Sequence, residues 1–200
     1  MNARLFGEFF VTLLVIMDPP GSVPIFLSLT GTHTRRARRR SADLAVATAF
    51  VVIVAFALFG QQVLQYLHVT LPALQVAGGL LLLLVALELL MGWGSGPTSN
   101  GDANVSMVPL GTPLLAGPGA IAATIVFSKS VHHFRDGLAL AIAIVAVHIV
   151  IWLTLRFSTV ILRLLRRSGV TLLTRIAGLL LSAIAVQLAA DGIRAFVEAK

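Results

Sequence analysis

Three polar side chains that could do chemistry lie within long apolar stretches of this chain: Asp18, Glu88 and His148. A charge held in the hydrocarbon interior of a bilayer costs at least about 2.5–3.5 kcal/mol, so such groups are expected to serve binding or proton transfer. For Asp18 the functional interpretations are a protonatable coupling group and a partner for a substrate amine. The alternative is a helix cap, because an Asp directly before Pro19 is well placed to begin a helix. These interpretations are compatible, since a cap at a break inside the membrane would also line a cavity.

The other polar groups give weaker indications of a functional role. Glu88 is a second coupling candidate, and its alternative is exposure near the membrane surface. His148 has no carboxylate nearby in sequence, which favours a buried, hydrogen-bonded histidine over a proton relay, and Gln187 is expected to face the interior of the bundle. The chain has no cysteine, no familiar metal-ligand spacing of histidines and no motif of a nucleophilic enzyme. We therefore expect no catalytic residues, no metal and no cofactor.

Proline and glycine gather at two places within apolar stretches. Proline removes a backbone donor and glycine loosens a helix, so neither stretch is expected to be continuous helix. Broken helices at membrane depth need partners for their freed backbone groups, and two matched breaks indicate a substrate site. The free N–H groups at the start of each second half-helix would favour a carboxylate or another anion. Simple kinks for packing are the alternative. The substrate-binding candidates are Asp18, Pro19, Pro20, Gly21, Ser22 and Pro24 at the first break, and Gly117, Pro118, Gly119 and Thr124 at the second.

The elements that must position these residues are transmembrane helices. Of the 200 residues, 58% are hydrophobic, against roughly 45–50% in soluble domains, and the mean hydropathy is +0.96. The excess lies in runs long enough to cross a bilayer, which takes about 20 residues. We predict an all-α membrane protein forming a single transmembrane domain over residues 1–200. Its six expected spans cover about residues 5–29, 44–64, 73–93, 107–127, 138–155 and 172–190.

The basic residues predict how the bundle is oriented. The net charge is +7, and the positive side chains fall between spans, as expected for topology signals and lipid contacts rather than for nucleic-acid binding. Ten lie on one side: Arg35, Arg36, Arg38, Arg39, Arg40, Arg156, Arg163, Arg166, Arg167 and Arg175. Five lie on the other: Arg4, Lys129, Arg135, Arg194 and Lys200. The richer side is expected inside, which places both termini outside, in the periplasm of a bacterial inner membrane.

The two halves of the chain resemble each other. Residues 77–82, Ala-Gly-Gly-Leu-Leu-Leu, have a counterpart in residues 177–182, Ala-Gly-Leu-Leu-Leu-Ser. Pro20-Gly21 and Pro118-Gly119 are separated by nearly the same offset. Because each unit has three spans, the second copy must enter the membrane upside down. We predict two inverted three-helix repeats, about residues 5–93 and 107–195, with the first and fourth helices broken.

Two of these motifs resemble those of a known family. Residues 18–30 are similar to the D-P-x-G-N-x-P-x-F-x-x-L-T signature of the MarC family of integral membrane proteins, and residues 113–121 to its P-L-L-A-G-P-G-A-I motif. The resemblance covers nearly the whole chain and implies a six-helix inner-membrane protein related to transporters of neutral amino acids. Ser22 stands where the family usually has Asn. Ser has one hydroxyl, whereas Asn has two donors and an acceptor, so selectivity is expected to differ if this side chain touches substrate.

The expected function is secondary transport of small solutes, with neutral amino acids such as glycine or alanine implied by the resemblance. The expected partners are this substrate, the lipid bilayer and a coupling proton or sodium ion. Broken helices can also line a passive channel, which is the alternative. A further alternative is a membrane protein that has a regulatory role and does not transport a solute.

Overall fold

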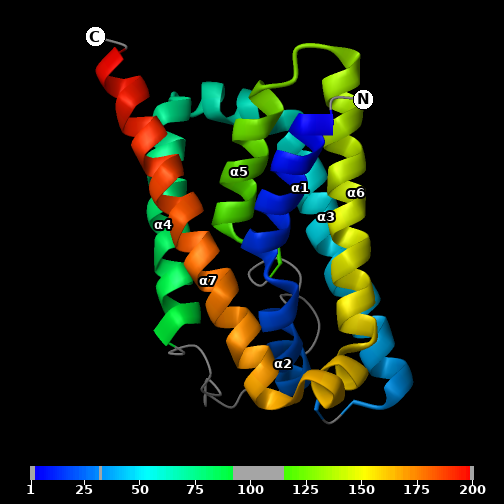
Figure 1. Ribbon diagram of the computed structural model, residues 1–200. Coiled ribbons are helices and arrows are strands. Elements are labelled where there is room, and N and C mark those ends of the chain that lie inside the picture. Colours follow the sequence, from blue (N-terminus) through cyan, green and yellow to red (C-terminus); the bar gives the residue numbers. More distant parts are fainter. Residues whose placement is uncertain (1–2, 32, 92–114, 199–200) are drawn as a thin grey trace.

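The protein is built from helices throughout the residues that the computed structural model describes, which are 3–31, 33–91 and 115–198 (Figure 1). This confirms the all-α prediction. The helices are α1 (Ala3–Met17), α2 (Pro19–Leu29), α3 (Arg35–Tyr66), α4 (Leu71–Met91), α5 (Pro118–Lys129), α6 (Phe134–Arg156) and α7 (Ser158–Glu198).

Five segments of the described chain are long and apolar enough to cross a membrane. They are Ala3–Val23, Arg35–Tyr66, Leu71–Met91, Phe134–Arg156 and Ser168–Glu198. These correspond to the first, second, third, fifth and sixth expected spans. The fourth is represented by α5, whose 12 residues rise only about 18 Å and cannot cross by themselves. Residues 107–114, where this span was expected to begin, lie outside the described residues.

The first expected break lies at Asp18. Helix α1 ends at Met17 and α2 begins at Pro19, with Asp18 between them at φ 38° and ψ 72°. This left-handed conformation is uncommon for a residue with a side chain, although Asp tolerates it better than most. Pro19 and Pro20 lack the N–H groups that would continue the hydrogen bonds of α1, so a new helix starts here.

Two helices extend well beyond the apolar stretches that predicted them. Helix α3 begins at Arg35, where Thr34 caps it by accepting a hydrogen bond from the backbone N–H of Ala37 at 3.3 Å. Helix α7 begins at Ser158, ahead of its apolar part. An apolar run marks only the part of a helix that lies in hydrocarbon, and arginine is itself a good helix former.

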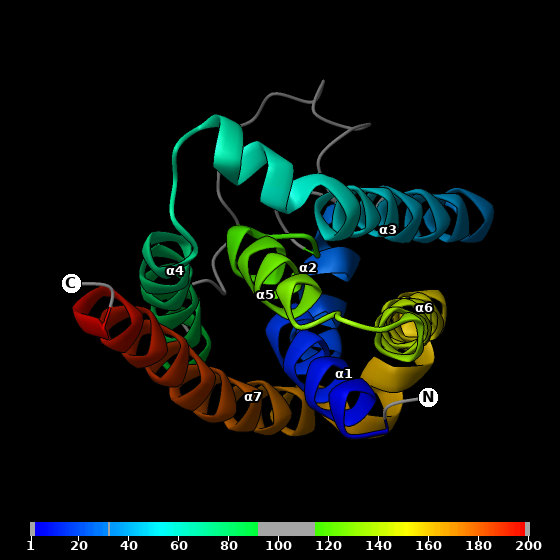
Figure 2. The ribbon, with the colours of Figure 1, turned by 90° about the horizontal axis from the view of Figure 1, so that it is seen from above.

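The helices form two packed groups (Figure 2). In the first, α1, α3 and α6 bury a cluster that includes Phe9, Leu13 and Ile151, and the start of α5 joins it. In the second, α4 and α7 run antiparallel and bury Leu82 and Leu181 between them. Both ends of the described chain lie at the upper end of the bundle in Figure 1.

Small residues set the close approach of α4 and α7. A Cβ added to Gly79 would lie 2.7 Å from the carbonyl oxygen of Ala185, and one on Gly178 would lie 3.1 Å from that of Ala86. Such close backbone contacts are typical of helix pairs in membranes, where packing supplies much of the driving force. The same packing leaves Gln187 on the outside of α7, where it donates to Asp191 of its own helix. The expectation that Gln187 faces the interior is therefore wrong.

Candidate functional site

Helices α2 and α5 both begin about half-way along the bundle (Figure 1). From there α2 runs toward the lower end and α5 toward the upper end, so their N-termini lie in the same middle zone. Residues at the two starts belong to one buried cluster, with Met17 beside α2 and Leu115, Ala116 and Ala120 at α5. We call this region the break zone.

The carboxylate of Asp18 is the outstanding polar group of the break zone. The residue is only 7% exposed, and neither carboxylate oxygen has a hydrogen bond of good geometry within the described part of the chain, although the backbone N–H of Gly21 lies near it. It occupies the N-cap position of α2 but makes no capping hydrogen bond. A Cβ added to Gly21 would overlap it, so the carboxylate lies against the first turn of α2. Buried polar groups are nearly always paired, and one left without a partner is a candidate for ligand binding.

The start of α5 has backbone donors that its own helix leaves without an acceptor. Gly117 holds the N-cap position in an extended conformation, and Pro118 follows at the first helical position. The backbone N–H of Ile121 bonds the carbonyl of Gly117 at 3.1 Å. The N–H groups of Gly119 and Ala120 come before this bond and have no acceptor within their own helix. Such groups, with the positive end of the helix dipole, form a natural anion site.

The two hydroxyl candidates turn back toward their own helices. Ser22 donates to the carbonyl oxygen of Asp18 at 2.9 Å, and Thr124 donates to that of Ala120 at 2.7 Å. Both side chains are buried. Their protons are engaged, so what each can still offer a ligand is a lone pair on the oxygen.

The remaining candidates divide between helix starts and the outer surface. Pro19 and Pro20 form the first turn of α2, with Pro24 further along it, while Pro118 opens α5. Glu88, in contrast, is exposed on α4. The structure also brings in Thr174 of α7, whose methyl group would lie 3.3 Å from a Cβ on Gly21. Nothing in the local sequence pointed to Thr174, because its position depends on how α7 crosses α2.

In the described residues, a helical bundle with five apolar crossing segments and two helices starting at its middle defines a multi-pass integral membrane protein. Residues 3–197 match the family described as MarC family integral membrane protein, and the chain belongs to that family. The resemblance seen in the sequence is thereby confirmed.

Three relatives carry names of the same kind. The UPF0056 membrane protein MJ1677 of Methanocaldococcus jannaschii is 34% identical over 97% of this chain and 98% of its own length. A UPF0056 membrane protein of Aquifex aeolicus is 36% identical over 95% and 92%. The UPF0056 membrane protein YhcE of Escherichia coli is 30% identical over 95% and 92%. No solved structure gives a significant match to the chain.

Proposed function

We propose that this protein is a secondary transporter of small neutral amino acids, such as glycine or alanine, and that the substrate binds in the break zone. The observation that carries this proposal is the pair of half-helices that begin in the middle of the bundle. One has a buried carboxylate without a counter-charge among the described residues, and the other has N–H groups that its own helix does not bond. Discontinuous helices of this kind hold the substrates of many secondary transporters.

The chemistry of the two helix starts is complementary to a zwitterion. The carboxylate of Asp18 would pair with the substrate ammonium group. The free N–H groups of Gly119 and Ala120 would receive the substrate carboxylate. Bringing both charges of an amino acid to opposite partners offsets the cost of taking them out of water, which either partner alone would not do.

The surroundings of the break zone favour a small side chain on the substrate. Met17 and Leu115 are almost completely buried there, as is Ala116. A Cβ added to Gly119 would overlap Leu82 of α4, so the start of α5 has little free space. Because these described residues are tightly packed, we propose that binding requires the helices to move, as in alternating access.

We also propose that the bundle consists of two inverted repeats, about residues 5–93 and 107–195, and has six transmembrane helices. The contacts of α4 with α7 support this. A two-fold axis that relates residue n to residue n + 100 would map residue 79 onto 179 and residue 185 onto 85. The contact of Gly79 with Ala185 should then recur between residues 179 and 85. The observed contact is between Gly178 and Ala86, one position away on each helix. Rocking one repeat against the other would then open the break zone to each side in turn.

Further parts of the proposal concern coupling and orientation. Asp18 is the better coupling candidate for a proton or sodium ion, because it is buried in the break zone whereas Glu88 is exposed. We further propose that both termini lie on the periplasmic side of an inner membrane, because the arginine-rich beginnings of α3 and α7 would then face the inside.

The test is uptake of labelled alanine and glycine into proteoliposomes containing the purified protein. Saturable, stereoselective flux above that of empty liposomes supports the transporter. Unitary currents across a planar bilayer would instead support a passive channel. Absence of flux for every small amino acid tested would refute the proposal and favour a regulatory role.

A further inference from the structure

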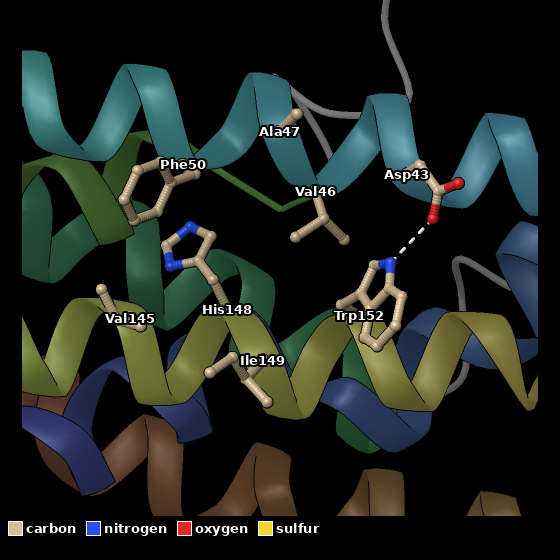
Figure 3. Close-up of a pocket in the computed structure, with 8 residues that line it drawn as sticks. All are labelled: Asp43, Val46, Ala47, Phe50, Val145, His148, Ile149 and Trp152. Carbon is tan, nitrogen blue, oxygen red and sulfur yellow. Dashed lines mark hydrogen bonds between the residues drawn. The ribbon is translucent and has the colours of Figure 1, made fainter.

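The break zone and the groove between α3 and α6 differ in the state of their carboxylates. In the groove, Asp43 accepts the indole N–H of Trp152 at 2.7 Å (Figure 3), and the guanidinium of Arg156 lies 3.3 Å from the same oxygen. Asp18 has no hydrogen bond of good geometry among the described residues. Of these two carboxylates, Asp18 is therefore the one left to receive a substrate ammonium group, and the residues around it decide what else of the substrate fits.

One face of α4 lies against the first turns of α5. A Cβ added to Gly78 would lie 2.6 Å from the Cβ of Ala122. One turn further along α4, Leu82 reaches Gly119, and the three described atoms nearest to a Cβ on Gly119 all belong to Leu82. The residue number rises on α4 as it falls on α5, so the two helices are antiparallel here and Leu82 lies beside the first turn of α5.

Leu82 is the large side chain on this face of α4. Residues spaced four apart share one side of a helix, which here gives Gly78, Leu82 and Ala86. Leu82 is 2% exposed and Ala86 is 0% exposed. Because α4 continues from Leu82 to Ala86 past the start of α5, an anion bound at that start is bordered by the isobutyl group of Leu82 and by the methyl group of Ala86.

The packing around Leu82 also extends to the other helix start. Val15 and Ile16, in the last turn of α1, pack against the buried cluster that contains Leu82. The backbone N–H of Asp18 bonds the carbonyl oxygen of Val15 at 3.2 Å. Leu82 therefore belongs to one packed group that extends from the turn before Asp18 to the first turn of α5.

We propose that Leu82 sets the upper limit on the size of the substrate side chain, which admits glycine and alanine and rejects valine and leucine. This inference rests on the proposed function, since it needs a zwitterion held between Asp18 and the start of α5. An α-amino acid has one carbon between its charged groups, and its side chain leaves from that carbon. The side chain then shares space with Leu82, whose backbone cannot retreat because Gly78 and Gly79 hold α4 against α5 and α7.

The experiment measures selectivity in proteoliposomes that contain the full-length protein. Uptake of labelled alanine is competed with unlabelled alanine or valine, and the ratio of the two half-inhibitory concentrations gives the preference. Leu82→Ala is the test variant. Leu181→Ala is its control, because Leu181 is 0% exposed and belongs to the same buried cluster. Both variants lose one core leucine, but only Leu82 supplies the atoms nearest to a Cβ on Gly119.

We expect valine to compete at least about tenfold more weakly than alanine for the wild-type protein, as discrimination by added carbon atoms predicts. Leu82→Ala should lower this ratio by about tenfold, and Leu181→Ala should leave it unchanged. Loss of a buried leucine also lowers stability, so folding is checked by the thermal unfolding midpoint. If an alanine variant does not fold, the milder pair Leu82→Val and Leu181→Val repeats the comparison, with a smaller fall in the ratio expected for Leu82→Val alone.

Equal ratios in the Leu82 and Leu181 variants would overturn the inference while transport itself stands, and Leu82 would then be a packing residue only. Valine that competes for the wild-type protein as well as alanine does would overturn it too. Absence of alanine uptake by the wild-type protein is a different result, because it refutes the proposed function and, with it, the bound substrate that this inference needs.

Discussion

The starts of α2 and α5 are built on the same plan but differ in charge. Each follows a non-helical N-cap residue and has proline at the first helical position. At α2 the N-cap is Asp18, and a second proline leaves only the N–H of Gly21 before the first helical hydrogen bond. At α5 the N-cap is Gly117, which brings no charge, and two N–H groups are left.

This difference shows how a repeated scaffold can hold a polar, asymmetric ligand. Two identical helix starts would both favour anions, because both present the positive end of a helix dipole. A carboxylate fixed at one of them reverses its preference and turns the pair into a site with one negative and one positive pole. The four predictions below test this comparison, beginning with the largest expected effect.

Neutralising the negative pole should remove transport without unfolding the protein. We expect Asp18→Asn to lower alanine flux in proteoliposomes by at least about tenfold, as loss of a buried charge partner predicts. Its thermal unfolding midpoint should not fall, because a buried carboxylate without a partner costs about 1–3 kcal/mol. Asp43→Asn is the matched control and should keep normal flux. A lower midpoint together with lost flux would make Asp18 a structural residue.

Adding a negative charge at the start of α5, the positive pole of the site, should hinder binding of the substrate carboxylate. Gly117 has φ −66° and ψ 170°, which any residue can adopt, so Gly117→Asp should be accepted by the backbone. We expect its KM for alanine to rise on the order of tenfold, since an anion at a helix N-terminus is worth up to ~2 kcal/mol. Gly117→Asn has nearly the same size and no charge. If both variants raise KM equally, crowding rather than charge is responsible and the assignment of this pole fails.

The inverted-repeat proposal predicts similar sensitivity at Gly79 and Gly178, the glycines through which α4 and α7 each approach the backbone of the other. Gly79→Leu and Gly178→Leu each force a side chain against the facing backbone. Each should destabilise the protein by about 1–3 kcal/mol, as overpacking does. Gly7→Leu is the control, because a Cβ there meets nothing within 4 Å. Thermal unfolding in nanodiscs measures all three, and a large effect at only one of Gly79 and Gly178 would argue against the repeat.

Much of this arrangement was predictable from local sequence. The prolines inside an apolar stretch predicted a first break within residues 18–24, and the structure has it at Asp18, with α2 continuous from Pro19. Apolar runs predicted six spans, and five of them are helices long enough to cross in the described chain, because a bilayer imposes a fixed length on such runs. They did not give the ends of α3 and α7, since polar residues outside hydrocarbon continue a helix without any change in hydropathy.

What depends on packing between distant segments could not be predicted. Trp152 and Asp43 are 109 positions apart and meet only because α6 lies beside α3. The local sequence gave no sign that Thr174 would lie near Gly21, or that Gln187 would face outward. The burial of His148 and its hydrogen bond to the carbonyl oxygen of Ile144 were expected, but its position against α3 depends on how α6 packs there.

The smallest expected effects come from the hydroxyls of the two half-helices. Ser22 and Thr124 each donate to a carbonyl of their own first turns. If this is their whole role, Ser22→Ala and Thr124→Val should each change stability by less than about 1 kcal/mol and leave the KM for alanine unchanged. Because the hydroxyl oxygens keep a free lone pair, a substrate ammonium group could also use one of them. A rise in KM for Ser22→Ala alone would extend the negative pole from Asp18 to Ser22. A rise for Thr124→Val alone would place an ammonium partner at α5 and reverse the polarity inferred for the site.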